Sequence, residues 1–138
     1  MKLFLKLGLI VILSLLALSV IINFIAPRDK ITTTQVTRYR MDFLRSRILE
    51  YGRTQGELPA DLSALARLPI KPEYEHWKKP EDCWRRKIIY EVDASGRITL
   101  KSFGKDGVPG GSGRNADIVL SFPSRRPDGT WSEASDSY

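Results

Sequence analysis

Hydrophobic and polar positions divide the chain into a long apolar run near its start and a mixed remainder. Residues 7–26 contain no charged side chain, and this stretch is long enough to cross the hydrocarbon core of a membrane as a helix. A removable secretory signal is the alternative, because Lys2 and Lys6 precede the run, but such apolar regions are usually shorter and residues 23–27 make a poor cleavage site. We therefore expect a retained transmembrane anchor at residues 1–27 and one domain at residues 28–138.

Apolar residues after the anchor recur at spacings of three and four, with charged residues between them. The series is Val36, Tyr39, Phe43, Leu44, Ile48 and Tyr51. This pattern predicts an amphipathic helix in which Val36, Phe43 and Ile48 help to present the helix to the core. The threonines at 32–34 are candidate N-caps, and Gly52 and Gly56 are candidate stop signals.

The next stretch predicts a short second helix that opens at residues 58–59 and ends before the prolines at 69 and 72. Its core-facing residues would be Leu62, Leu65 and Leu68. Residues 72–84 are rich in proline and charge, with Tyr74, Trp77 and Trp84 interspersed, which indicates an ordered surface loop pinned by aromatic rings. An aromatic platform for a ligand is the alternative interpretation of the same rings.

The second half of the chain predicts a small antiparallel sheet. Residues 87–92 and 97–101 flank a turn at 93–96 and read as a β-hairpin, and residues 118–122 form a third candidate strand. A helix packed on such a sheet accounts for this order of elements, so we expect an α+β fold.

A loop rich in glycine joins the second and third candidate strands, and residues 100–118 read LKSFGKDGVPGGSGRNADI. Glycines allow tight turns, while Asp106, Asn115 and Asp117 offer the oxygen ligands that calcium prefers. Lys105 and Arg114 lie directly beside two of these donors and make the local field less negative than a tight calcium site requires. The residues alone leave both explanations open, a calcium site or a tight turn without an ion.

Charge and cysteine usage narrow the range of functions. The net charge is +6 and the pI is about 9.6, but the cations are scattered among sixteen acids, so a nucleic-acid partner is not favoured. The one local basic patch, residues 85–87, reads as a solvated turn. Cys83 is the single cysteine, which excludes an internal disulfide or a cysteine metal cluster. No nucleophile with a base and no phosphate loop is visible, so we predict no enzymatic activity.

Three separate motifs resemble the major pseudopilin of bacterial type II secretion systems, within the wider class of type IV pilin-like proteins. In that family a helix ends in tyrosine, a polar stretch and a proline before a Leu-x-x-Leu segment, and residues 51–65, YGRTQGELPADLSAL, are similar. Its Asp-Pro-Trp-Gly turn before a tyrosine-containing strand resembles residues 82–90, DCWRRKIIY. Its Ser-x-Gly-x-Asp-Gly stretch and later Asp-Ala-Asp-Ile are similar to residues 102–107 and 115–118.

The resemblance implies a pilin-like fold and a structural subunit that acts by protein–protein assembly in protein export. Its expected partners are other pseudopilins and inner-membrane secretion components, in a homo- or hetero-oligomer. Its expected location is the inner membrane, single-pass, with the C-terminal domain in the periplasm. The resemblance also implies a calcium site formed by Asp106, Asn115 and Asp117, with a carbonyl near Phe103 as an additional ligand.

The sequence departs from the family at two places. Asn115 stands where the family usually has an acid, which should weaken calcium binding. Lys2, Lys6 and Gly8 imitate the basic leader of a pilin precursor, but Leu13 occupies the position of its glutamate, so processing and fibre assembly are expected to differ. A second class of function remains open, a membrane-tethered periplasmic module that uses its basic face and Trp77 or Trp84 to bind an anionic ligand or DNA.

Overall fold

The computed structural model describes residues 31–135, which form one long helix, three short 3-10 helices and a three-stranded sheet. The elements in chain order are α2 (Thr33–Gln55), η1 (Leu62–Arg67), η2 (Pro72–Trp77), β1 (Ile89–Val92), β2 (Arg97–Ser102), η3 (Gly113–Asn115) and β3 (Ile118–Pro123). The predicted anchor at residues 7–26 lies outside the described residues. Within residues 31–135, no helix is long and apolar enough to span a membrane.

The N-cap of helix α2 is Thr32, one of the three predicted candidates, and it forms a capping box with Gln35. The Thr32 side chain accepts a hydrogen bond from the Gln35 backbone N–H, and the Gln35 side chain accepts one from the Thr32 N–H, which satisfies two of the free donors of the first turn. Gly56 ends the helix in a left-handed conformation at φ 80°. The prediction that Gly52 is a stop signal is wrong, because Gly52 lies inside the helix and is buried.

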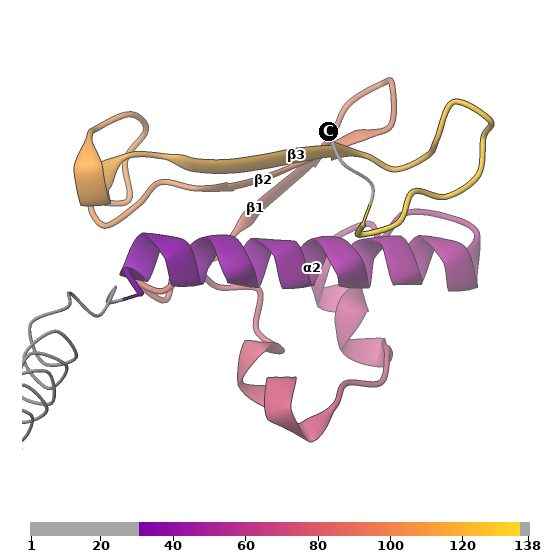
Figure 1. The fold of residues 1–138 in the computed structure, drawn as a ribbon, viewed down its shortest axis with the longest axis horizontal. Helices are drawn as coiled ribbons and strands as arrows, with labels where there is room; N and C mark the ends of the chain where they lie inside the picture. Colours follow the sequence, from indigo (N-terminus) through magenta and orange to yellow (C-terminus); the bar gives the residue numbers. More distant parts are fainter. Residues whose placement is uncertain (1–30, 136–138) are drawn as a thin grey trace, which may run out of the picture. The chain divides into compact units, whose positions relative to one another are not determined.

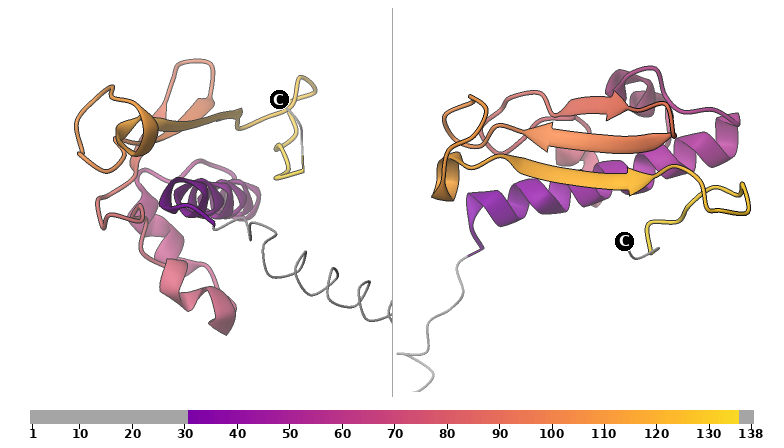
Figure 2. Two further views of the ribbon diagram at one scale, coloured as in Figure 1. Left: turned by 60° about the vertical axis from the view of Figure 1, so that its left-hand side comes forward. Right: turned by 90° about the horizontal axis from the view of Figure 1, so that it is seen from above.

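The sheet is antiparallel with the strand order β1-β2-β3, so β2 lies in the centre. Ile98 and Leu100 of β2 are fully buried, in register with Phe122 and Leu120 of β3 respectively. Because alternate residues of a strand point to one face, this face of the sheet is apolar. Helix α2 runs along the sheet (Figure 1), and the left-hand view of Figure 2 shows the two as separate layers.

The core lies between α2 and the sheet, which confirms the predicted α+β arrangement of one helix on a small antiparallel sheet. The helix contributes Met41, Leu44, Ile48 and Leu49, and the sheet contributes Ile98, Leu100, Ile118 and Phe122. Ile48 was predicted to face the core and is fully buried, whereas Val36 and Phe43 are only half-buried. The Phe43 ring instead lies 5.4 Å from that of Tyr74 and 5.5 Å from that of Trp77, so the aromatic residues pin η2 to the helix.

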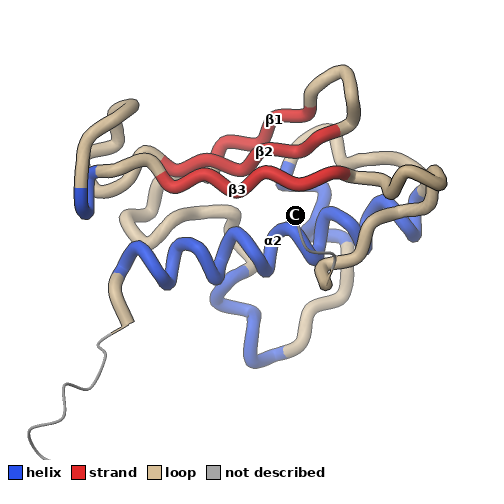
Figure 3. Tube along the Cα trace, turned by 45° about the horizontal axis from the view of Figure 1, so that its top comes forward, coloured by secondary structure: helices blue, strands red, loops and turns tan. Residues whose placement is uncertain are grey.

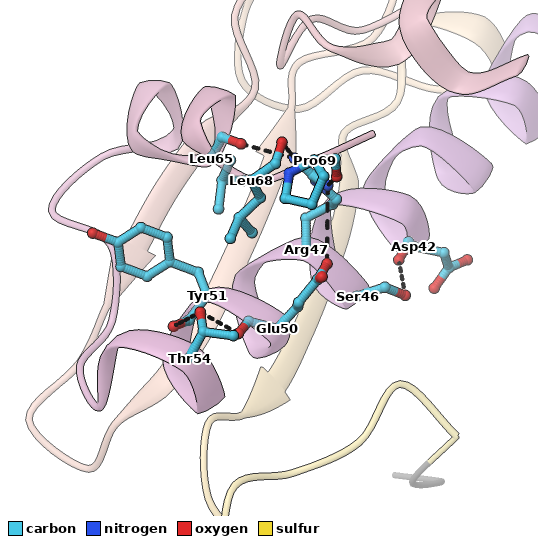
Figure 4. A network of polar contacts seen from close by, with 9 residues as sticks. All are labelled: Asp42, Ser46, Arg47, Glu50, Tyr51, Thr54, Leu65, Leu68 and Pro69. Atoms are coloured by element: carbon cyan, nitrogen blue, oxygen red, sulfur yellow. Dashed lines mark hydrogen bonds and ion pairs between the residues drawn. The ribbon is translucent and has the colours of Figure 1, made fainter. Parts of the chain in front are cut away.

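On its other side, α2 holds the segment of η1 through a buried arginine. The Arg47 guanidinium donates to the backbone carbonyls of Leu65 at 2.8 Å and Leu68 at 2.9 Å, and also to that of Pro69 (Figure 4). These carbonyls lie in the last turn of η1 and directly after it, and the Leu65 carbonyl also accepts the Leu68 N–H at 3.1 Å. Arg47 is 8 % exposed, although the sequence pattern places it among the polar positions of the helix.

The chain after β3, residues 124–135, folds back along the C-terminal half of α2, and we call this segment the strap (Figure 3). Arg53 of α2 donates to the carbonyl of Ser132 at 3.1 Å, and Arg45 donates to that of Ala134 at 2.8 Å. The Trp131 ring lies directly over Gly52, because a Cβ at that glycine would come within 2.4 Å of the ring. The missing side chain at Gly52 is therefore what lets the strap approach the helix.

Candidate functional site

The residues predicted to form a metal site lie in the loop between β2 and β3, residues 103–117, which we call the glycine loop. It extends from the end of the sheet near the N-terminal end of α2 (Figures 1 and 2). The loop closes on itself through two backbone bonds: Lys105 N–H donates to the Arg114 carbonyl at 2.9 Å, and Gly107 N–H donates to the Phe103 carbonyl at 3.2 Å. Its ends are fixed by the pairing of Ser102 with Ile118.

Both predicted carboxylate ligands bond to backbone N–H groups of this loop. The Asp106 Oδ1 accepts from Val108 N–H at 3.3 Å, and the Asp117 Oδ1 accepts from Gly110 N–H at 3.0 Å. The Asp106 bond spans two residues, as in an Asx turn, and the Asp117 bond ties the end of the loop to Gly110, seven residues earlier. Asp106 is exposed and Asp117 is half-buried.

The two remaining predicted ligands are also part of the backbone network of the loop. The Phe103 carbonyl accepts the Gly107 N–H, and Asn115 lies exposed at the end of η3, where its N–H donates to the Ser112 carbonyl at 3.1 Å. Among residues 31–135, no group of three or more histidine, cysteine, aspartate or glutamate side chains gathers at one point. Calcium binding at Asp106, Asn115, Asp117 and Phe103 stays a prediction.

A cationic group from outside the glycine loop binds to its backbone, the guanidinium of Arg86. The sequence gives no sign of this contact. The guanidinium donates through Nη1 to the Gly104 carbonyl and through Nη2 to the Lys105 carbonyl, both at 2.7 Å. The loop backbone also approaches this side chain closely, because a Cβ at Gly107 would lie 2.6 Å from the Arg86 Nε. Gly107, at φ 74°, is therefore required both by its conformation and by its contact with the arginine.

Arg86 reaches the loop from a turn at residues 82–86 that is organised by a buried aspartate, and we call it the Asp82 turn. The Asp82 Oδ1 accepts from the N–H groups of Trp84 at 2.8 Å and Arg86 at 3.0 Å, and its Oδ2 accepts from the Ser102 hydroxyl at 2.7 Å. Asp82 is 1 % exposed, and these three bonds compensate the loss of water around a buried carboxylate. The Ser102 hydroxyl in turn accepts from Gly104 N–H at 3.3 Å, which links the turn to the start of the glycine loop.

Helix α2 holds the Asp82 turn from the other side. The Arg40 Nη1 donates to the carbonyls of Glu81 and Asp82, each at 3.2 Å, and the Thr37 hydroxyl accepts from the Cys83 N–H at 3.3 Å. The turn therefore connects α2, the end of β2 and the glycine loop.

Comparison with known protein families identifies one family that matches most of the chain. A model of the family described as type II secretion system protein G matches residues 25–121. The chain belongs to this family. No curated protein and no solved structure matches the chain.

The matched range of this major pseudopilin family includes α2, the Asp82 turn and the glycine loop, and it ends inside β3, so the strap lies beyond it. Within the Asp82 turn, Arg85 stands where the pseudopilin motif has glycine. It is the one non-glycine residue among the described residues with a positive φ, at 63°, a conformation that costs a residue with a Cβ more than it costs glycine.

Sequence reasoning missed Arg86, Asp82 and Ser102 as parts of this site. Asp82 accepts hydrogen bonds from N–H groups two and four residues later, which is a local turn signal. The bond from Arg86 to the loop spans 18 residues and leaves no local pattern in the sequence. The basic patch at residues 85–87 was predicted to be a solvated turn. Residues 85–87 are exposed, as this prediction requires. The guanidinium of Arg86 nevertheless donates to the backbone carbonyls of Gly104 and Lys105.

Proposed function

We propose that the chain is a membrane-anchored, non-enzymatic pseudopilin of a type II secretion-type system. In this proposal residues 7–26 anchor it in the inner membrane, and the domain of residues 28–138 lies in the periplasm. It works by assembling with other pseudopilins and with inner-membrane secretion components. The observation that carries the proposal is the family match over residues 25–121, a range that includes the long helix, the sheet and the loop between β2 and β3.

The way in which polar groups are used supports a structural role. The buried Asp82 carboxylate bonds to two backbone N–H groups and a hydroxyl, and the Arg86 guanidinium bonds to two carbonyls. Such contacts fix the shape of the chain, whereas a catalytic acid or nucleophile needs a partner directed at a substrate.

The alternative, a binding module for an anionic ligand or DNA, has less support from the contacts. Several arginines donate to backbone carbonyls within the domain, which leaves less of the positive charge as an open basic face. They are Arg40, Arg45, Arg47, Arg53, Arg86 and Arg125. The Trp77 ring packs against Phe43, 5.5 Å away, and its exposure is intermediate. DNA binding that falls steeply with salt would favour this alternative.

The test is to delete the gene in its bacterial host and to restore it with the full chain carrying a C-terminal epitope. We expect the chain to sediment with the inner membrane, to cross-link chemically to itself and to other pseudopilins, and to restore release of secreted proteins. A variant with Leu15→Lys and Leu18→Lys should leave the membrane, because each charge near the centre of a span costs about 2.5–3.5 kcal/mol.

The matched control is Val108→Lys with Val119→Lys, which adds the same charges at exposed apolar positions of the domain. This control should stay in the membrane fraction. A wild-type chain found in the soluble fraction, or one that forms no cross-links while secretion depends on it, would contradict the proposal.

A further inference from the structure

We propose that Arg86 is the internal cation of the glycine loop, so that the loop keeps its shape without a bound calcium ion. The proposal concerns the folded domain and holds whether or not the chain assembles in a secretion system. It chooses between the two explanations that the sequence leaves open for this loop, a calcium site or a turn without an ion.

The Arg86 guanidinium joins two backbone carbonyls of the glycine loop. Consecutive carbonyls at Gly104 and Lys105 both point at Arg86, each at 2.7 Å from a different nitrogen of the same planar group. Carbonyl oxygens that converge in an irregular loop repel one another unless a donor or a cation lies between them. Arginine supplies both charge and donors in a fixed fork, which suits two adjacent acceptors better than a single ammonium does.

Three of the predicted calcium ligands in the loop already accept hydrogen bonds. The carboxylates of Asp106 and Asp117 each accept a loop N–H, and the Phe103 carbonyl accepts that of Gly107. Asn115 contributes a neutral amide, and Lys105 and Arg114 add positive charge to the same loop. An ion that used the carbonyls of Gly104 or Lys105 would have to displace a group of its own charge.

The Asp82 turn holds the backbone of Arg86 in place beside the loop. This backbone is fixed on both sides by Asp82, whose carboxylate accepts the Arg86 N–H at 3.0 Å and whose own N–H donates to the Arg86 carbonyl at 2.8 Å. The preceding residue, Arg85, takes the left-handed conformation that this turn requires. Less backbone entropy is then lost when the guanidinium meets the loop.

The experiment uses the purified full-length chain and four proteins: wild type, Arg86→Met, Arg86→Lys and Arg114→Met. Thermal unfolding is measured for each in excess calcium and in excess chelator, together with hydrogen exchange of the loop amides. Arg114→Met is the matched control, because it removes the same charge from an exposed position of the same loop.

We expect wild type to melt at the same temperature with calcium and with chelator. Arg86→Met should lower the melting temperature by about 5 °C in both conditions and should speed exchange at the amides of Lys105 and Gly107. Arg86→Lys should fall between the two, since an ammonium lacks the fork, and Arg114→Met should match wild type.

Two results would overturn the proposal. One is a rise in the wild-type melting temperature with calcium that the chelator reverses. The other is an Arg86→Met protein whose melting temperature and loop exchange match those of Arg114→Met. If Arg86→Met does not fold, the comparison of wild type in calcium and in chelator still decides whether the loop depends on the ion.

Discussion

Tyr90 of β1 carries a hydroxyl that is buried and has no hydrogen-bond partner among the described residues. A buried donor without a partner costs free energy, so replacing it by an apolar group should help the folded state. We expect Tyr90→Phe to raise the free energy of unfolding by about 1 kcal/mol in urea titrations. Tyr39→Phe, at an exposed position, is the control and should change nothing. A loss of stability in Tyr90→Phe would show that solvent reaches the hydroxyl.

Burial also raises the pKa of Tyr90 to about 12 in the folded chain. The unfolded chain releases this proton near its ordinary pKa of about 10, so the folded state binds more protons between these values. Stability should therefore be lost as pH rises through that window. Tyr90→Phe should remove this part of the alkaline loss when unfolding is followed as a function of pH.

The contacts of two arginines could not be predicted from the sequence. The buried arginine of α2, Arg47, and the loop arginine, Arg86, both stand in polar stretches and read as solvated charges. Their acceptors are carbonyls at least 18 residues away along the chain, and a backbone carbonyl has no signature in the sequence. The family resemblance implied that Asp106 and Asp117 share a calcium site, and the structure shows each accepting an N–H of the loop that contains them.

At the scale of elements, α2 and η1 share the apolar core and are also joined by the Arg47 side chain, and this polar contact can be tested. Arg47→Met keeps the apolar stem of the side chain but removes the charged donor from the carbonyls of Leu65 and Leu68. We expect a loss of about 3 kcal/mol in the free energy of unfolding, because buried acceptors would lose charge-assisted bonds. Arg67→Met, at an exposed position of η1, is the control. Equal stabilities for the two variants would contradict this assignment.

Elements were predicted well where the signal is local. The threonine N-cap, the stop at Gly56 and the hairpin between β1 and β2 each depend on residues a few positions apart. Gly52 was misread because a glycine in a helical pattern usually indicates an end, and the ring that explains it, Trp131, comes from the far end of the domain. Packing partners of this kind cannot be inferred from periodicity.

At the scale of the whole molecule, the strap connects the end of the described chain to its long helix. Gly52→Leu would place a side chain where the Trp131 ring now lies. We expect the strap to detach, so that limited proteolysis cuts within residues 124–135, even though leucine favours the helix by about 0.8 kcal/mol over glycine. Thr54→Leu, on an exposed position of the same helix, should leave the strap protected. Equal protection in both variants would show that Trp131 does not hold the strap.

Fold class and family were both accessible from the sequence, since one amphipathic helix and three short strands limit the possible arrangements. The anchor at residues 7–26 and its orientation stay predictions, as do calcium binding and assembly. These properties depend on a membrane, an ion or a second chain, and contacts within residues 31–135 do not report on them.

The arginines along α2 give the helix a particular response to force. Arg45 and Arg53 bond to the strap, and Arg47 bonds to the segment of η1, from a helix about 34 Å long. A pull along the helix axis would load these bonds in shear, together with the apolar contacts to the sheet. Because they share the load in parallel, they would have to fail together, whereas contacts loaded one after another separate at low force. A domain built in this way resists having its long helix drawn out lengthwise.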